Sequence, residues 1–306
     1  MEIMNKNEKS KGCGGMSNIV MLDQLNHFNI TQILESGQVF RFEKITEHSY
    51  LLNAKQKLIK ITQQPDSSSA IIYNTNISEL DEMWIPYFDI DTDYANIAQK
   101  LSNKDEHIAK AIEFGKGIRI LHQDPWEMLI SFIISQNKSI PHIKQCIKNI
   151  SQQFGFPLEQ INGVDQHYYA FPRPKELSKA TEEQLRACKV GFRAPYIMDA
   201  CRKVLNGDII LNELFILSTE EARAKLMTIK GVGPKIADCI LLFAYGKQDV
   251  FPTDVWVKRV VEGLYFNGRE VSLKQIQEFA NSYFEDLAGY AQQYLFYYAR
   301  ENSLFK

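Results

Sequence analysis

The first part of the chain carries short runs in which apolar and polar residues alternate, as they do in strands that bury one face. Residues 38–42 and 57–62 follow this pattern, and an apolar run at residues 69–73 comes after the turn-forming residues 65–68. These runs predict a small antiparallel sheet that has one face exposed to solvent.

From about Ile77 onward the pattern becomes helical. Asp124 followed by Pro125 predicts a helix start, because Asp caps free backbone N–H groups and Pro fits the first helical position. Residues 181–184 and 218–221 have the spacing of capping boxes. The predicted fold class is therefore α+β, with an N-terminal antiparallel β-sheet unit packed on a mainly helical body.

The pattern divides the chain into a flexible tail at residues 1–17, an N-terminal α+β domain at 18–123 and a helical body at 124–306. The 306 residues are 45% hydrophobic and 24% charged, which suffices for a packed core without crosslinks. A net charge of -2 does not favour nucleic-acid binding, so a DNA-binding chain of this composition must gather its cations on one face.

The chain has five cysteines, an odd number, and no CxxC pair. Neither a disulfide framework nor a metal site is therefore predicted. This usage favours a reducing intracellular compartment, which would be the cytoplasm beside the nucleoid if the source is prokaryotic. No apolar run is long enough to span a bilayer, so we expect no association with a membrane.

A turn with two glycines joins two predicted helices at about residues 218–246. Gly231 and Gly233 lie in this turn, and Pro234 is placed to start the second helix. Glycine lets the backbone approach a ligand closely, and the free N–H groups at a helix start can bind a phosphate without a charged side chain. An ordinary tight turn between two helices explains the same pattern, so both interpretations stay open.

Lys235 lies in the first turn of the second helix, where the helix macrodipole disfavours a cation. The free amine that this position favours is the form that acts as a nucleophile. An exposed surface lysine is the alternative. Asp254 follows a short loop. It is placed either to cap the N-terminus of the next helix or to face the positive charge of a sugar-centred transition state. One carboxylate can serve both purposes.

Residues 231–235 and 252–254 together resemble the helix–hairpin–helix, Gly/Pro-rich loop and Asp signature of base-excision DNA glycosylases. The lysine makes the chain similar to the bifunctional branch. Within that branch, the chain from about residue 29 to residue 300 resembles the 8-oxoguanine DNA glycosylase/AP lyase family. The segments that carry this further resemblance are residues 36–42, 117–127, 135–137, 191–194 and 291–296.

The resemblance implies an enzyme that excises 8-oxoguanine from duplex DNA after the damaged nucleotide has flipped out of the helix. It implies that Lys235 attacks C1′ of the deoxyribose, that a Schiff base forms, and that β-elimination then nicks the strand. Asp254 would stabilise the charge that develops on the sugar. The implied partner is double-stranded DNA containing an oxidised purine. We expect a monomer that needs no cofactor and no metal.

The resemblance also implies a base pocket. Phe296 would stack on the flipped base, Gln292 one helical turn earlier would bond to its Watson–Crick edge, and Cys239 would pack against its other face. The carbonyl of Gly37 would accept a hydrogen bond from N7–H of 8-oxoguanine, where guanine has only a lone pair. Taken alone, Phe296 and Cys239 are typical core residues and Gly37 is typical of a turn.

A second set of residues would contact the DNA around the lesion. The resemblance implies that Asn137 and Arg193 bind the base left behind in the opposite strand, and that Phe192 fills the gap in the stack. The predicted DNA-binding residues are Asn137, Phe192, Arg193, Gly231, Val232, Gly233 and Trp256.

The chain departs from the animal members of the family at some of these positions. His142 stands where they carry an arginine, Phe192 replaces a tyrosine, and Trp256 replaces a histidine. The missing arginine leads to the hypothesis that the enzyme has a relaxed preference for the base opposite the lesion.

Two other functions remain open from the sequence. A monofunctional helix–hairpin–helix glycosylase for alkylated bases would rely on Asp254, with Lys235 incidental. A non-catalytic DNA-binding module would use the turn only to hold phosphate, and would need neither residue. An iron–sulfur glycosylase is disfavoured, because that branch needs four closely spaced cysteines and no cysteine follows Cys239.

Overall fold

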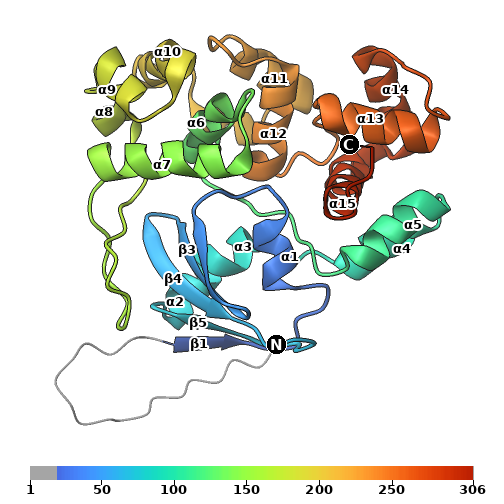
Figure 1. The fold of residues 1–306 in the computed structure, drawn as a ribbon, viewed down its shortest axis with the longest axis horizontal. Helices are drawn as coiled ribbons and strands as arrows, with labels where there is room; N and C mark the ends of the chain where they lie inside the picture. Colours follow the sequence, from blue (N-terminus) through green and yellow to red (C-terminus); the bar gives the residue numbers. More distant parts are fainter. Residues whose placement is uncertain (1–18, 306) are drawn as a thin grey trace.

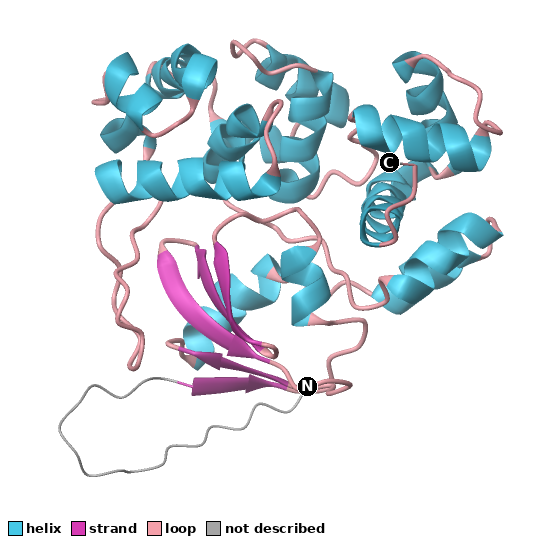
Figure 2. Cartoon of the chain, in the orientation of Figure 1, coloured by secondary structure: helices cyan, strands magenta, loops and turns pink. Residues whose placement is uncertain are grey.

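The computed structural model describes residues 19–305, so the predicted flexible tail at residues 1–17 lies outside the described residues. A five-stranded sheet forms one end of the molecule and a body of helices forms the other (Figure 1). Figure 2 shows that all strands lie in this one unit. The predicted α+β class is confirmed.

The sheet is antiparallel throughout, in the order β1-β5-β4-β3-β2. The first elements of the chain are β1 (Ile19–Leu22), α1 (Ile30–Glu35), β2 (Phe42–Thr46), β3 (Ser49–Ala54), β4 (Lys57–Thr62) and β5 (Ala70–Tyr73). They are followed by α2 (Ile77–Glu79), the π-helical turn η1 (Leu80–Trp84), α3 (Ile85–Tyr87), α4 (Tyr94–Ser102) and α5 (Glu106–Phe114). The strand predicted at residues 57–62 is confirmed as β4, and β5 begins one residue later than the run predicted at residues 69–73.

The helical body begins with α6 (Pro125–Ser135), α7 (Ile140–Phe154), α8 (Pro174–Leu177), α9 (Glu182–Ala187), the 3₁₀ turn η2 (Gly191–Arg193) and α10 (Ala194–Leu205). It continues with η3 (Leu211–Phe215), α11 (Thr219–Met227), α12 (Pro234–Tyr245), α13 (Val255–Tyr265), α14 (Leu273–Tyr283), η4 (Glu285–Leu287) and α15 (Ala288–Glu301). None of the helices within residues 19–305 combines the length and the apolar character that crossing a membrane requires.

The helix starts follow the local signals. The Asp124 side chain accepts a hydrogen bond from the backbone N–H of Glu127 at 2.8 Å, so the predicted cap of α6 is confirmed. Both predicted capping boxes are present, at the starts of α9 and α11. These elements form because the residues that satisfy their first N–H groups lie within three positions along the chain.

The predicted strand at residues 38–42 is wrong, since only Phe42 belongs to β2. The cause is Gln38, which is fully buried and bonds through its side chain to other loops. Its side-chain Nε2 donates to the carbonyls of Ile33 and Arg119 at 3.2 and 2.8 Å, and its Oε1 accepts from the Leu121 N–H at 2.8 Å. The amide side chain therefore fixes an irregular loop where the apolar alternation indicated a strand.

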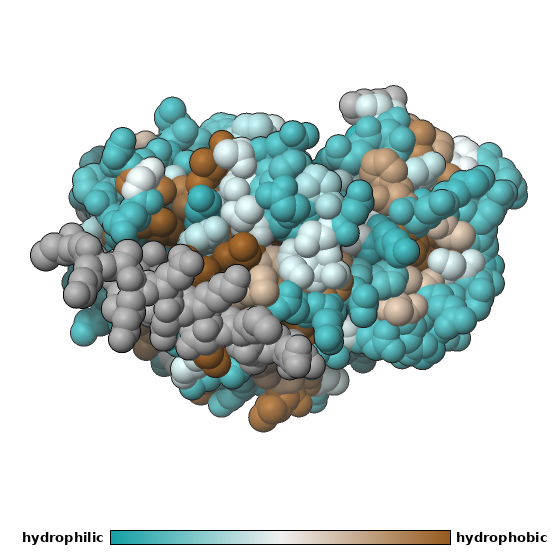
Figure 3. Space-filling view, turned by 90° about the horizontal axis from the view of Figure 1, so that it is seen from below, coloured by the Kyte–Doolittle hydropathy of each residue, from teal (hydrophilic) through white to brown (hydrophobic). Residues whose placement is uncertain are grey.

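The prediction of one solvent-exposed sheet face is also wrong for the centre of the sheet. All six residues of β3 are buried. Leu51 and Leu58 on the second face pack against Ile161, which belongs to the long connection between α7 and α8. Seen from the sheet end, the surface is mostly hydrophilic with small hydrophobic patches (Figure 3). A distant segment thus covers the face that the alternating pattern assigned to water.

The main core lies in the helical body and includes residues of α4 and α5, which pack near α15 (Figure 1). A second core lies between the sheet, α1 and the short helices after β5. The boundary predicted at residues 123 and 124 falls directly before α6 and stays a prediction. At the centre, α6 and α12 pack on each other, and each is buried along nearly its whole length.

We expect Gln38→Leu to lower the free energy of unfolding by about 2–4 kcal/mol, because it leaves several buried carbonyl and N–H groups without partners. Gln64→Leu, at an exposed position, should change it by about 0.5 kcal/mol or less. Urea unfolding of both variants measures the difference. Equal losses would contradict a special role for the Gln38 side chain.

Candidate active site

The turn between α11 and α12 has a backbone that only glycine adopts without strain. Gly231 has a φ of +80°, and a Cβ atom there would lie 2.3 Å from Cδ2 of Tyr196. At Gly233, with a φ of -97°, a Cβ atom would meet nothing within 4 Å among the described residues. The two glycines therefore differ: Gly231 is required by the fold, whereas Gly233 keeps the surface of the turn open.

Asp199 anchors this turn from α10, a contact that the sequence did not reveal. Its carboxylate accepts a hydrogen bond from the backbone N–H of Lys230 at 2.9 Å and pairs with Lys203 at 3.6 Å. Although burial acts to raise it, the pKa of Asp199 lies below its ordinary value because of the Lys230 N–H and the cations of Arg202 and Lys203. Asp199 is thus a buried anion that holds the turn in place.

Lys235 projects from the first turn of α12 and is half-buried. Its Nζ lies 5.7 Å from the centroid of the Phe132 ring, which itself stacks on Phe243 at 5.7 Å. Burial raises the pKa of the Cys239 thiol, whereas the neighbouring Lys235 acts to lower it, partly through a side-chain hydrogen bond. The amine of Lys235 therefore lies close to both the Phe132 ring and the Cys239 thiol.

Asp254 lies beside the same group of residues. Its carboxylate also acts on the Cys239 thiol, in the direction that raises the pKa of that thiol. Its Oδ1 accepts hydrogen bonds from the backbone N–H groups of Trp256 at 3.0 Å and Val257 at 2.8 Å, so the predicted cap of α13 is confirmed. Capping fixes the orientation of the carboxylate and leaves its other oxygen available.

Of the residues predicted for the base pocket, Gly37 lies in the loop after α1, Gln292 and Phe296 lie on α15, and Cys239 lies on α12. Gly37 has a φ of +89°, and a Cβ atom there would lie 3.0 Å from Cε1 of Phe296. The Gln293 side chain donates to the carbonyl of Ser36 at 3.1 Å, which ties the loop to α15. Trp256 packs edge-on against Phe296, with 5.4 Å between ring centroids. Trp256 thus joins the Asp254 end of α13 to this pocket.

Gln292 has a side chain that the fold leaves unused. The residue is only 6% exposed, yet its Oε1 has no hydrogen-bond partner within residues 19–305. A buried amide oxygen without a partner destabilises the folded protein by about 1–3 kcal/mol. Such a group on the wall of a site is suited to recognise a polar ligand.

Asn137, Phe192 and Arg193 lie on two loops that the structure brings together. Arg193 is 4% exposed and donates to the carbonyls of Val190, at 3.0 Å, and of Gln136, which precedes Asn137. Its guanidinium carbon lies 4.2 Å from the centroid of the Phe192 ring. Phe192 itself is 50% exposed, and Asn137 is exposed as well. An aromatic ring thus protrudes beside an arginine that holds both loops.

Further cations lie next to this surface. Lys138 donates to the carbonyl of Lys189 at 3.1 Å and lies 2.9 Å from Nε2 of His142. Partial desolvation and the charges of Lys138, Arg193 and Lys189 hold the pKa of His142 below its ordinary value. His142 is therefore mostly neutral near pH 7.

The predicted residues form a continuous set. The Asp254 cap leads through Trp256 to Phe296 and Gly37, and Cys239 joins Asp254 to Lys235. The turn at Gly231 packs on Tyr196, whose ring lies 6.1 Å from that of Phe192. Sequence reasoning missed Arg300, whose guanidinium lies 5.6 Å from the Phe296 ring. The spacing of four residues between them on one helix was the available signal.

Comparison with known proteins shows the family of this chain. Residues 20–129 match the family model of the 8-oxoguanine DNA glycosylase N-terminal domain, and residues 130–286 match that of the HhH-GPD superfamily of base excision DNA repair proteins. The chain belongs to the 8-oxoguanine DNA glycosylases of the HhH-GPD superfamily. The N-glycosylase/DNA lyase of Saccharomyces cerevisiae is 32% identical over 77% of this chain and 68% of the yeast protein.

Two solved structures of this family are similar over almost the whole chain. MBOgg1, in complex with a low-affinity DNA ligand, is 44% identical with a TM-score of 0.90 over 99% of this chain and 100% of its own. The 8-oxoguanine glycosylase/lyase of Clostridium acetobutylicum, bound to duplex DNA with cytosine opposite 8-oxoG, is 40% identical. Its TM-score is 0.90, and the match covers 99% of each chain.

We expect Gly231→Ala to destabilise this glycosylase by about 2 kcal/mol or more, because it combines left-handed strain with the Tyr196 clash. Gly233→Ala is the matched control and should cost about 1 kcal/mol or less, as expected for replacing glycine at an N-cap. Urea unfolding distinguishes the two. Similar losses for both variants would contradict the assignment of the steric constraint to Gly231.

Proposed function

We propose that this glycosylase removes 8-oxoguanine from duplex DNA and then cleaves the strand, with Lys235 as the nucleophile. The observation that carries the assignment is the grouping of Lys235, Asp254 and Cys239 beside the pocket of Gly37 and Phe296. Such a reaction needs an amine nucleophile, a carboxylate in a fixed position and an aromatic ring that can stack on the base, all close together.

Lys235 acts through the free-amine form of its side chain. Its Nζ lone pair attacks C1′ of the flipped nucleotide while the bond from C1′ to the base breaks, and the base leaves with that electron pair. The Asp254 carboxylate faces the positive charge that develops on the sugar and lowers the energy of the transition state. Ring opening gives an imine between C1′ and Nζ, and loss of a proton from C2′ then expels the 3′ phosphate.

Recognition of the base rests on one carbonyl and one amide. The Gly37 carbonyl accepts a hydrogen bond from N7–H of 8-oxoguanine and repels the lone pair that guanine has at N7. Gln292 bonds to the Watson–Crick edge, a role supported by its buried and unpaired Oε1. Phe296 stacks on one face of the base and Cys239 lies against the other. A buried polar group left without its partner is what makes such discrimination strong.

The DNA partner is held mainly by groups that carry no net charge. The backbone N–H groups of the turn residues Gly231, Val232 and Gly233 bind a phosphate, supported by the open surface above Gly233. Phe192 enters the stack as a wedge, and Asn137 and Arg193 contact the base left behind. The protein acts as a monomer on double-stranded DNA containing an oxidised purine, and the steps need no cofactor or metal.

The cellular site of action follows from the cysteines. An odd number of thiols, four of them unpaired and buried within the described residues, supports a reducing compartment. We infer that this compartment is the cytoplasm beside the nucleoid if the source is prokaryotic.

The two alternative functions are less well supported. A monofunctional enzyme for alkylated bases has no use for a lysine whose amine faces the Cys239 thiol. A pure DNA-binding module has no use for the Gln292 amide in a pocket lined by Phe296. Both residues have clear roles in the bifunctional reaction.

Borohydride trapping tests the nucleophile directly. On a duplex with 8-oxoguanine opposite cytosine, wild-type protein should form a covalent complex and Lys235→Gln should form none, with strand cleavage reduced at least about 10³-fold. Lys230→Gln, in the same turn, is the matched control and should trap normally. Base release that survives Lys235→Gln would favour the monofunctional enzyme, and no base release from any lesion would leave only the binding module.

The opposite-base preference tests the role of His142. An arginine fork discriminates between bases by about 1–3 kcal/mol, and a mostly neutral histidine does not replace it. Cleavage rates opposite the four bases should therefore differ by less than about tenfold for wild type, with a larger preference for cytosine in His142→Arg. A steep cytosine preference in wild type, measured in single-turnover assays, would refute the hypothesis.

A further inference from the structure

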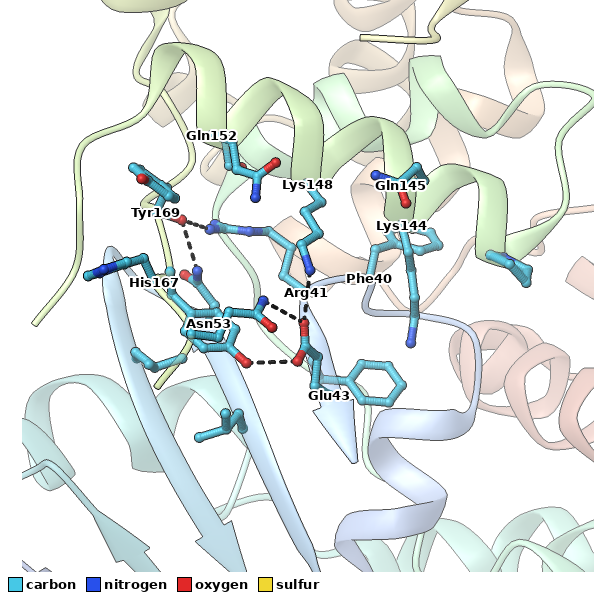
Figure 4. Close-up of a pocket in the computed structure, with 17 residues that line it drawn as sticks. Phe40, Arg41, Glu43, Asn53, Lys144, Gln145, Lys148, Gln152, His167 and Tyr169 are labelled. Carbon is cyan, nitrogen blue, oxygen red and sulfur yellow. Dashed lines mark hydrogen bonds and ion pairs between the residues drawn. The ribbon is translucent and has the colours of Figure 1, made fainter. Parts of the chain in front are cut away.

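A cavity of about 310 Å³ lies between the sheet, α7 and the connection from α7 to α8 (Figure 4). No residue proposed for catalysis, base recognition or DNA contact lines it. Its walls are largely apolar and aromatic, and are formed by Phe40, Phe42, Leu51, Leu58 and Tyr168. The volume lies at the lower end of the range of small-molecule sites, which are typically about 300–1,000 Å³.

Two of the residues that line this cavity, Asn53 and Ser151, each carry a buried polar atom that has no partner within residues 19–305. Asn53 is 6% exposed, and its Nδ2 donates to the Tyr169 carbonyl at 2.9 Å, while its Oδ1 has no partner in residues 19–305. Ser151, on α7, is 4% exposed, and its hydroxyl likewise has no partner in that range. Because Oδ1 is an amide carbonyl oxygen, it can only accept a hydrogen bond. A ligand with an N–H or O–H group would satisfy it.

Lys144, which forms no salt bridge with a carboxylate of residues 19–305, lines the same cavity. Lys144 projects from α7 toward the strands, and its Nζ lies 3.3 Å from the centroid of the Phe42 ring (Figure 4). Burial lowers the pKa of Lys144 to about 8, against the opposite effect of Glu35 and Glu43. One turn further along α7, Lys148 differs, because it pairs with Glu43 at 3.5 Å. An anion placed beside Lys144 would therefore give its ammonium group a direct ionic partner.

We propose that this cavity binds a small aromatic monoanion that carries a ring N–H or O–H donor. The ring lies between the apolar walls, the anionic group binds the Lys144 ammonium, and the ring donor binds Asn53 Oδ1 with Ser151 nearby. A DNA phosphate lacks both the ring and the donor, so the site is distinct in chemistry from the proposed DNA surface. The proposal concerns a second ligand and does not depend on the glycosylase reaction.

Three related probes test each element of recognition on the full chain. Indole-3-acetate has the ring, the anion and the N–H donor; 1-methylindole-3-acetate lacks the donor, and indole-3-ethanol lacks the anion. Titration calorimetry should show one site for indole-3-acetate and affinities weaker by about tenfold or more for the other two. Equal affinities for all three probes, or no binding of indole-3-acetate at millimolar concentration, would overturn the proposal.

Matched variants locate the binding site. Lys144→Met should weaken indole-3-acetate by about tenfold or more and Ser151→Ala by a few-fold, whereas Lys148→Met should change the affinity less than about twofold. Equal effects of the two lysine variants would mean general surface attraction and would refute the site. Lys235→Gln saturated with 8-oxoguanine duplex should still bind the probe, because the cavity is separate from the base pocket. Competition by that duplex would assign the binding to the base pocket instead.

Discussion

The packing of α6 on α12 is the contact on which the rest of the molecule depends. Phe132 stacks on Phe243 at 5.7 Å with nearly parallel rings, and both helices are buried along most of their length. α12 carries Lys235 in its first turn, and α6 ends directly before the loop with Asn137. The lysine proposed as nucleophile and the asparagine proposed for the opposite strand are therefore fixed relative to each other by one apolar interface, whose rigidity comes from close packing.

The near-neutral charge of the chain is compatible with DNA binding because cations next to the proposed DNA-contact residues are held in fixed positions. Arg193 is buried against two carbonyls, and Lys138 lies over the carbonyl of Lys189, so each is held in one position. The phosphate binding that we propose for the backbone N–H groups at the start of α12 would add no formal charge. Such a surface depends on geometry more than on bulk charge, which limits its attraction to undamaged DNA.

Sequence reasoning predicted the features that depend on neighbours within one helical turn. The caps at Asp124 and Asp254 and the turn at Gly231 follow from residues three or four positions apart. It failed where the partner lies far along the chain. The loop of Gln38 is bonded to Arg119 and Leu121, and the second sheet face is covered by Ile161. The pattern of residues near one position in the sequence does not predict contacts with such distant segments. The roles of the site residues came from resemblance rather than from periodicity.

Buried amide side chains in this fold differ in whether their hydrogen-bonding groups are all used. Gln38 is buried with its amide fully used, and it serves the loop that holds Gly37. Gln292 and Asn53 are buried with an amide oxygen unused, although each costs stability. Burial alone therefore does not distinguish a structural amide from a recognition amide, and the unused oxygens of Gln292 and Asn53 gain meaning from the pockets that these two residues line. We therefore propose the Gln292 oxygen as the acceptor for a base edge and the Asn53 oxygen as the acceptor for a donor from a different ligand.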